Sequence, residues 1–142
     1  MGQVSATSAI DIDAAPEVVL AALADYQTVR PAILPANYRD FAYNDDGTVH
    51  WILQATEKRQ RDVLADVAVT ADSVTETDRN SSMVTVYRVG SAGAGARVEV
   101  TTSWQGAGGI GGFFEKTFAP KGLSRIQAEL LGNLKTRLEV GA

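Results

Sequence analysis

The pattern of hydrophobic and polar positions predicts a strand at the start of the chain. Over residues 4–12, apolar side chains alternate with polar ones, as in Ile10-Asp11-Ile12. A period of two is typical of a half-buried strand, because successive strand residues point to opposite faces. We therefore expect the first element to be a β-strand.

Two short helices are predicted directly after this strand. Pro16 and Glu17 favour the first turn of a helix, and this helix should end near Tyr26. A second helical segment is expected over residues 27–34, interrupted by Pro31, since proline lacks an N–H donor.

The middle of the chain has the alternation and turn signals of an antiparallel meander. Asp45-Asp46-Gly47 predicts a hairpin turn, with glycine free to adopt a positive φ. Residues 79–82 predict another turn, although one long bulged strand there is a competing interpretation. The expected strands are residues 39–44, 48–57, 61–70, 73–78, 83–89 and 97–105, with a turn at 58–60 and a flexible one at 91–95. With the first strand they make about seven.

The end of the chain changes to helical periodicity. Residues 121–140 carry leucine or isoleucine at three- and four-residue spacing, namely at Leu123, Ile126, Leu130, Leu131, Leu134 and Leu138. This spacing predicts a long amphipathic helix whose apolar stripe must be buried against the sheet. An aromatic cluster of Phe113, Phe114 and Phe118 precedes it.

Length and composition narrow the class of protein. The 142 residues predict a single domain over 1–142, and 45% hydrophobic with 21% charged residues is typical of a globular protein. A net charge of −4 argues against nucleic acid as a partner. Without a long apolar run or a signal-peptide pattern, we expect no stable membrane insertion and a cytoplasmic location.

The chain has no cysteine and a single histidine, His50. This excludes disulfides, zinc–thiolate sites and cysteine nucleophiles, and a serine–histidine–aspartate triad would have to use His50. We expect no cofactor and no metal. Because His50 alternates with Trp51, we expect it to face solvent rather than act in catalysis, and Asp62 and Asp66 should likewise be surface carboxylates.

One glycine-rich segment matches a nucleotide-binding motif by its letters alone. Gly106-Ala107-Gly108-Gly109-Ile110-Gly111 satisfies G-x-G-x-x-G, but no second parallel strand follows it. We interpret residues 106–112 as a flexible crossover from strand to helix. Lys58, Arg59 and Arg61 form a small basic turn that we interpret as a solvated edge.

The order of these elements, together with three segments, resembles a known superfamily. The segments are Ile12-Asp13-Ala14-Ala15-Pro16-Glu17-Val18-Val19, Ala24-Asp25-Tyr26, and residues 111–120 leading into Leu134-Lys135. The chain resembles START-like or Bet v 1-like proteins, in the polyketide cyclase/dehydrase (SRPBCC) branch. The resemblance implies an α+β helix-grip fold, in which a curved antiparallel sheet of about seven strands surrounds the C-terminal helix and two short helices follow the first strand. It also implies an apolar cavity between sheet and helix, with the 106–112 loop at its mouth.

Strand parity and aromatic content suggest which residues line such a cavity. Thr85 shares parity with Tyr87, and Thr102 with Trp104, whereas Arg88 and Arg97 fall on the other face unless a bulge re-aims them. The candidate ligand-binding residues are Trp51, Leu53, Val67, Thr85, Tyr87, Thr102, Trp104, Phe114 and Phe118. Plain core packing is the alternative role for each.

Three functions remain open from the sequence. The first is binding or carriage of a lipid- or polyketide-like hydrophobic molecule by a monomer or weak homodimer. The alternative is an aromatase/cyclase-like enzyme acting on a polyketide-type substrate, with Tyr87 and an inward Thr or Arg as acid–base candidates, although no catalytic constellation is evident. Inward polar groups within hydrogen-bond reach of each other would favour the enzyme, and an all-apolar lining the carrier. A third class, an interaction module, predicts a filled core and an exposed apolar patch.

Overall fold

The structure is a computed structural model that describes residues 3–56, 59–105 and 120–140. Its elements, in chain order, are β1 (Gln3–Ile12), α1 (Pro16–Leu23), α2 (Val29–Ile33), β2 (Tyr38–Tyr43), β3 (Val49–Thr56), β4 (Arg59–Val69), β5 (Ser73–Asp78), β6 (Val84–Ala92), β7 (Gly95–Gln105) and α4 (Pro120–Val140). The described strands form one seven-stranded antiparallel sheet in the order β1-β7-β6-β5-β4-β3-β2. The predicted helix-grip class is confirmed.

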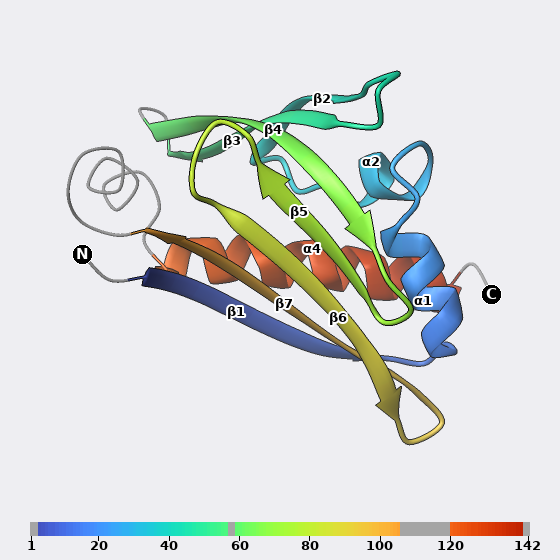
Figure 1. Cartoon of the computed structure of the whole chain (residues 1–142). Coiled ribbons are helices and arrows are strands. Elements are labelled where there is room, and N and C mark those ends of the chain that lie inside the picture. Colours follow the sequence, from blue (N-terminus) through green and yellow to red (C-terminus); the bar gives the residue numbers. More distant parts are fainter. Residues whose placement is uncertain (1–2, 57–58, 106–119, 141–142) are drawn as a thin grey trace.

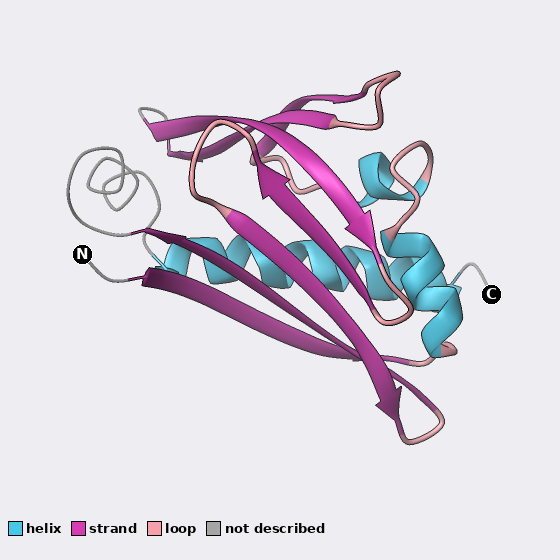
Figure 2. Ribbon diagram, in the orientation of Figure 1, coloured by secondary structure: helices cyan, strands magenta, loops and turns pink. Residues whose placement is uncertain are grey.

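The sheet curves around α4, while α1 and α2 close one end of the curve (Figure 1). The same view coloured by secondary structure shows the long helix α4 along the concave side of the sheet and the two short helices at its end (Figure 2). No helix among the described residues is long and apolar enough to cross a membrane.

Alternation along each strand decides which side chains face α4. On β7, Val98, Val100, Thr102 and Trp104 are buried, and the residues between them are more exposed. Trp51 is buried on β3, whereas His50 next to it lies on the outer face, where its Nε2 is 2.9 Å from Asp62 Oδ1. Arg88 is exposed and Arg97 pairs with Asp11 at 3.1 Å, so no bulge turns them inward.

Helix α4 buries its apolar stripe, including Leu130, Leu131 and Leu134, against the concave face. It is tied to the edge strand β1 by hydrogen bonds along its length. Ser8 Oγ donates to the Ser124 carbonyl at 2.9 Å, and Lys135 Nζ donates to the Asp11 carbonyl at 3.1 Å. These bonds fix the helix along β1, so its other flank faces the middle of the sheet.

Several element boundaries differ from the sequence-based expectation. Helix α2 is not interrupted by Pro31, because Pro31 occupies the first turn, where the missing N–H would have no partner in the helix. Helix α1 ends at Leu23 rather than near Tyr26. Strand β4 begins at Arg59, two residues earlier than expected. The 79–82 turn is confirmed, so β5 and β6 are separate strands and the single long strand is wrong.

The β6–β7 hairpin is tighter than the predicted 91–95 turn. Both strands continue to the pair Ala92 and Gly95, which leaves Gly93 and Ala94 as a two-residue loop, with Gly93 at φ 58°. Gly95 lies against the end of β1, and a Cβ added there would collide with the Ile12 carbonyl oxygen. The close approach of β7 to the end of β1 therefore requires glycine at position 95.

We predict that Gly95→Ala destabilises the protein by about 1–3 kcal/mol, because the β1 backbone must shift to admit a methyl group. Gly90→Ala is the matched control, since a Cβ at Gly90 would meet nothing within 4 Å. Urea unfolding of both variants measures the difference. Equal stability losses in the two variants would contradict the close approach at Gly95.

Candidate ligand-binding cavity

A buried arginine lies at the centre of the polar groups inside the sheet. Arg30, on α2, is only 3% exposed. Its Nη1 donates to the Leu23 carbonyl at 2.9 Å and to the Tyr26 hydroxyl at 2.8 Å. Its Nη2 donates to Glu76 Oε2 at 2.9 Å and to the Tyr87 hydroxyl at 3.0 Å. One guanidinium group thus joins α1, α2, β5 and β6.

Two aromatic rings flank the same guanidinium. Its carbon lies 4.5 Å from the centroid of the Tyr26 ring and 4.7 Å from that of Tyr87. Both distances are within the range of cation–π attraction, which strengthens when the cation is removed from water. The tyrosines therefore contact Arg30 through their rings as well as their hydroxyl oxygens.

Glu76 supplies the opposite charge. Alternation on β5 turns its side chain inward with Val74, and it is 5% exposed. Glu76 Oε2 accepts from both Arg30 and the Tyr26 hydroxyl, the latter at 2.6 Å. Such pairing offsets the cost of burying a carboxylate. Glu76 Oε1 accepts no hydrogen bond from any described residue.

The tyrosines around this pair are neutral at physiological pH. Burial is the main cause that raises the pKa of Tyr26, Tyr38 and Tyr87, and the Glu76 charge raises each further, while the Arg30 charge opposes both effects. Each phenol therefore keeps its proton and remains a hydrogen-bond donor. We name Arg30, Glu76, Tyr26 and Tyr87 the Arg30 network.

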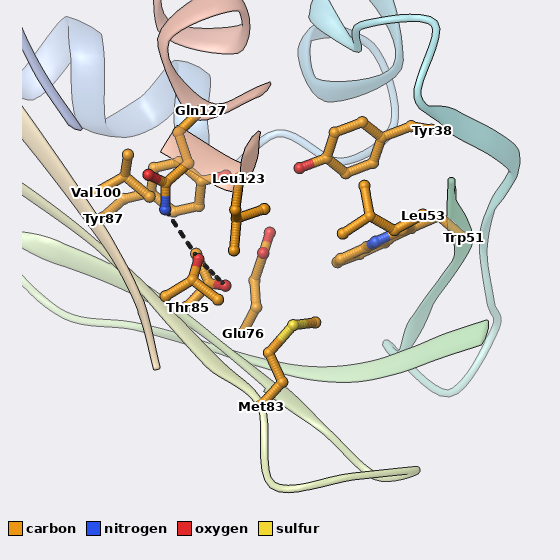
Figure 3. A pocket seen from close by; sticks show the side chains of 11 residues that line it. Tyr38, Trp51, Leu53, Glu76, Met83, Thr85, Tyr87, Val100, Leu123 and Gln127 are labelled. Carbon is orange, nitrogen blue, oxygen red and sulfur yellow. Dashed lines mark hydrogen bonds between the residues drawn. The ribbon is translucent and has the colours of Figure 1, made fainter. Parts of the chain in front are cut away.

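A cavity adjoins the Arg30 network on the concave side of the sheet (Figure 3). Its lining comes from β2, β3, β5, β6, β7 and α4 and comprises Tyr38, Trp51, Leu53, Glu76, Met83, Thr85, Tyr87, Val100, Thr102, Leu123 and Gln127. The cavity volume is about 20 Å³. This is room for about one water molecule.

One wall of the cavity carries a short polar chain. Thr85 and Thr102 on neighbouring strands share a hydrogen bond of 2.8 Å. Gln127 Nε2 donates to Thr102 Oγ1 at 3.1 Å and to the Ala6 carbonyl at 3.2 Å. The carbonyl of Ala6 can only accept, so it fixes the amide orientation. Gln127 Oε1 is then buried without a hydrogen-bond partner within residues 3–56, 59–105 and 120–140.

The opposite wall is aromatic. The Trp51 ring lies 5.9 Å from the ring of Tyr38 and stacks on Phe41 at 6.5 Å, measured between centroids. Trp51 Nε1 is buried and has no hydrogen-bond partner among the described residues. Figure 3 shows the Tyr38 hydroxyl pointing into the cavity.

The structure brings together five of the residues that the sequence suggested for the lining. They are Trp51, Leu53, Thr85, Tyr87 and Thr102. Val67 is half-buried on β4 and Trp104 fully buried on β7, but neither borders this cavity. Alternation along a strand predicts which face a side chain is on, but not where along the strand a cavity lies. Here the cavity meets β7 only at Val100 and Thr102. Phe114, Phe118 and the 106–112 loop lie outside the described residues.

Sequence reasoning missed the charged centre of the site. Glu76 could have been found, since it shares parity with Val74 and pairs with Thr85 across the sheet. Gln127 lies beside Ile126 on the buried stripe of α4. No sequence pattern marked Arg30 as buried, because a five-residue helix has too few positions to establish a buried face.

The outer face offers no second chemical centre in the described part of the chain. There Asp66 pairs with exposed Arg79 at 2.7 Å, and Asp62 pairs with His50. Among the residues described, no group of three or more His, Cys, Asp or Glu side chains could hold a metal ion. The Arg30 network and its cavity are therefore the candidate functional site.

Comparison with known proteins assigns the chain to a family. A family model described as polyketide cyclase/dehydrase and lipid transport matches residues 3–139. The solution structure of KanY protein is 52% identical, with a TM-score of 0.89 over 98% of this chain and 99% of that one. A comparison with curated proteins gave no match.

More distant structures share the fold alone. A START superfamily protein from Mycobacterium smegmatis is 10% identical, with a TM-score of 0.68 over 99% of this chain and 100% of that one. Major latex-like protein 151 from Panax ginseng is 15% identical, with a TM-score of 0.69 over 95% of this chain and 97% of that one. On the family match, the chain belongs to the polyketide cyclase/dehydrase and lipid transport family, and it shares its fold with the START superfamily protein and the major latex-like protein.

Proposed function

We propose that the protein binds and carries a hydrophobic small molecule in the cavity between the sheet and α4. The observation that carries this proposal is an enclosed space whose walls are largely apolar, with a few convergent polar groups. This combination is typical of small-molecule sites. The family description, which includes lipid transport, supports the same class of ligand.

The size of the cavity sets a condition on binding. Its volume of about 20 Å³ admits a water molecule, whereas ligand pockets are commonly about 300–1,000 Å³. Side chains on the wall must therefore move when a ligand enters. Met83 is suited to this because its thioether chain has three rotatable bonds. Leu123 is the other candidate, since it borders the cavity from the first turns of α4.

Native mass spectrometry after mild purification tests the proposal directly. We expect the protein to carry an added mass that is lost on denaturation, or to acquire one when naphthalene-sized aromatic probes are added. The control is the same preparation after extraction with organic solvent and refolding. A protein that stays at its bare mass under all of these conditions would refute the binding function.

Shortening a side chain on the cavity wall should strengthen binding of a hydrophobic ligand. Leu123→Ala should destabilise the protein by roughly 2–5 kcal/mol yet tighten binding of a hydrophobic probe, because it enlarges the cavity at the site. Leu134→Ala is the matched control on the same helix, since Leu134 is fully buried away from the cavity. Calorimetric titration with naphthalene measures both variants. If Leu134→Ala tightened binding equally, the probe would not enter this cavity.

A second candidate function is the cyclase-like enzyme. The observation that favours it is that Glu76 and Tyr87, both on the cavity wall, are held by one guanidinium group. A carboxylate can accept a proton from the carbon next to a ketone while a neutral phenol donates a hydrogen bond to the ketone oxygen. Arg30 Nη2 bonds both groups, so the carboxylate and the phenol are held close to one another at the cavity.

Deuterium exchange distinguishes an enzymatic function from a carrier function. If the site is catalytic, the protein should speed exchange of the methyl protons of 2-acetylnaphthalene in D2O, followed by NMR. Tyr87→Phe should then slow the exchange at least about tenfold, since acid–base groups contribute about 10²–10⁴-fold. Tyr43→Phe is the control, because Tyr43 is exposed on β2. Exchange at the protein-free rate would count against the enzyme and leave the carrier.

The remaining expectations stay part of this proposal. They are one domain, a cytoplasmic location, a monomer or weak homodimer, and no nucleic-acid partner. An interaction module has less support, because the exposed large hydrophobic side chains in the described part of the chain are Val18, Tyr43 and Val69, on three separate elements.

A further inference from the structure

Besides Gln127 Oε1, three polar atoms at the cavity have hydrogen-bonding capacity that the described residues do not use. Trp51 Nε1 is a buried donor that bonds to no residue in the described part of the chain. The Tyr38 hydroxyl makes no hydrogen bond with a described residue, although burial keeps it protonated and so able to donate. Glu76 Oε1 is an acceptor, since the bonds from Arg30 and Tyr26 both go to Oε2.

The residues that carry these groups stand on different walls of the same space. Figure 3 shows the Glu76 carboxylate rising toward Leu123 from the sheet and the Tyr38 hydroxyl pointing toward it from β2, with the Trp51 ring alongside. All three residues line the same cavity. The cavity therefore offers donors from one side and an anionic acceptor from the other.

Leaving buried polar groups without partners is costly. A donor or acceptor that loses its water without gaining a hydrogen bond destabilises the fold, so a protein interior seldom contains several around one space. Among the described residues that line this cavity, Trp51 Nε1 and Gln127 Oε1 are fully buried without a hydrogen-bond partner. The arrangement is better explained as half of a hydrogen-bonded site.

We infer that the ligand carries a hydroxyl group that donates to Glu76 Oε1 and accepts from Trp51 Nε1 or Tyr38. The inference rests on the proposed binding function and specifies the chemical class of its ligand as a hydrophobic alcohol or phenol. A hydroxyl is the smallest group that both donates and accepts, so it can satisfy both sides of the cavity.

Other polar groups fit the same atoms less well. An ether or ketone only accepts, and would leave Glu76 Oε1 without a donor. A carboxylate would bring a second negative charge beside Glu76, whose own charge is already balanced by Arg30. A hydrocarbon would leave all three groups unsatisfied.

A water molecule is the simplest occupant with the same chemistry, and the cavity volume of about 20 Å³ would hold one. A ligand hydroxyl would then replace this water and reproduce its bonds. A ligand that displaces an ordered water without replacing its bonds loses affinity. The preference for a hydroxyl therefore holds whether or not water fills the space first.

Calorimetric titration with four naphthalene derivatives tests the inference. The probes are 2-naphthol, 2-methoxynaphthalene, naphthalene and 2-naphthoate, which differ chiefly in the polar group. We expect 2-naphthol to bind at least about tenfold more tightly than 2-methoxynaphthalene, and 2-naphthoate to bind most weakly.

Two variants assign the preference to the cavity. Trp51→Phe and Tyr38→Phe each remove a donor and leave the Arg30–Glu76 pair intact. Each should reduce the ratio of 2-naphthol to 2-methoxynaphthalene affinity by about three- to tenfold. Naphthalene affinity should change little in Tyr38→Phe, whereas Trp51→Phe also enlarges the cavity, so the ratio is the readout there. Tyr43→Phe is the control. Glu76→Gln should reduce the ratio too, but it leaves Arg30 without its counter-charge, so circular dichroism must first show that this variant folds.

The outcomes distinguish the inference from the proposal on which it rests. Equal affinities for 2-naphthol and 2-methoxynaphthalene, or tightest binding of 2-naphthoate, would overturn hydroxyl recognition while binding itself stands. An unchanged ratio in both Trp51→Phe and Tyr38→Phe would also overturn it. Failure of all four probes to bind would instead refute the binding function.

Discussion

The buried ion pair between Arg30 and Glu76 is the interaction on which the site depends. Two charges at 3% and 5% exposure are tolerable only if each is paired and hydrogen-bonded. Tyr26 and Tyr87 complete that requirement, because they bond the ions and cover the guanidinium with their rings. The pair therefore joins the two short helices to the middle of the sheet. Removing either partner would leave the other charge buried and unpaired, at a cost of about 3–5 kcal/mol.

The turn after α1 and the short helix α2 place Arg30 in that position. Asp25 Oδ1 accepts from the backbone N–H groups of Gln27 and Thr28 at 3.1 and 2.9 Å, and so turns the chain after α1. Pro31 then falls in the first turn of α2, where its fixed φ suits a helix. A single turn of helix suffices, because its role is to direct one side chain inward.

The sheet could be predicted from the sequence and the charged centre could not, for one physical reason. Period-two alternation is repeated over many residues, so Val98, Val100 and Trp104 mark the buried face of β7 even if one position is misjudged. The Arg30–Glu76 contact depends on two single residues 46 positions apart. Only the folded path of the chain brings them together, and neither residue type is usually buried. The cavity depends on packing in the same way, so Val67 and Trp104 were assigned to the right face but lie beyond its limits.

In the proposed site, the two oxygens of Glu76 would connect stability to ligand recognition. Oε2 belongs to the Arg30 network, whereas Oε1 takes no part in it, and Glu76 lines a space that Trp51 and Tyr38 also border. A group that binds Oε1 therefore meets a carboxylate already fixed in orientation, and little side-chain entropy remains to be lost on binding. Met83, Leu123 and Leu53 carry no part of that network, so these positions can change the shape of the cavity without disturbing the charge pair. The fold thus separates a rigid polar anchor from an adaptable apolar wall, the division expected of a protein that orients one end of a hydrophobic molecule.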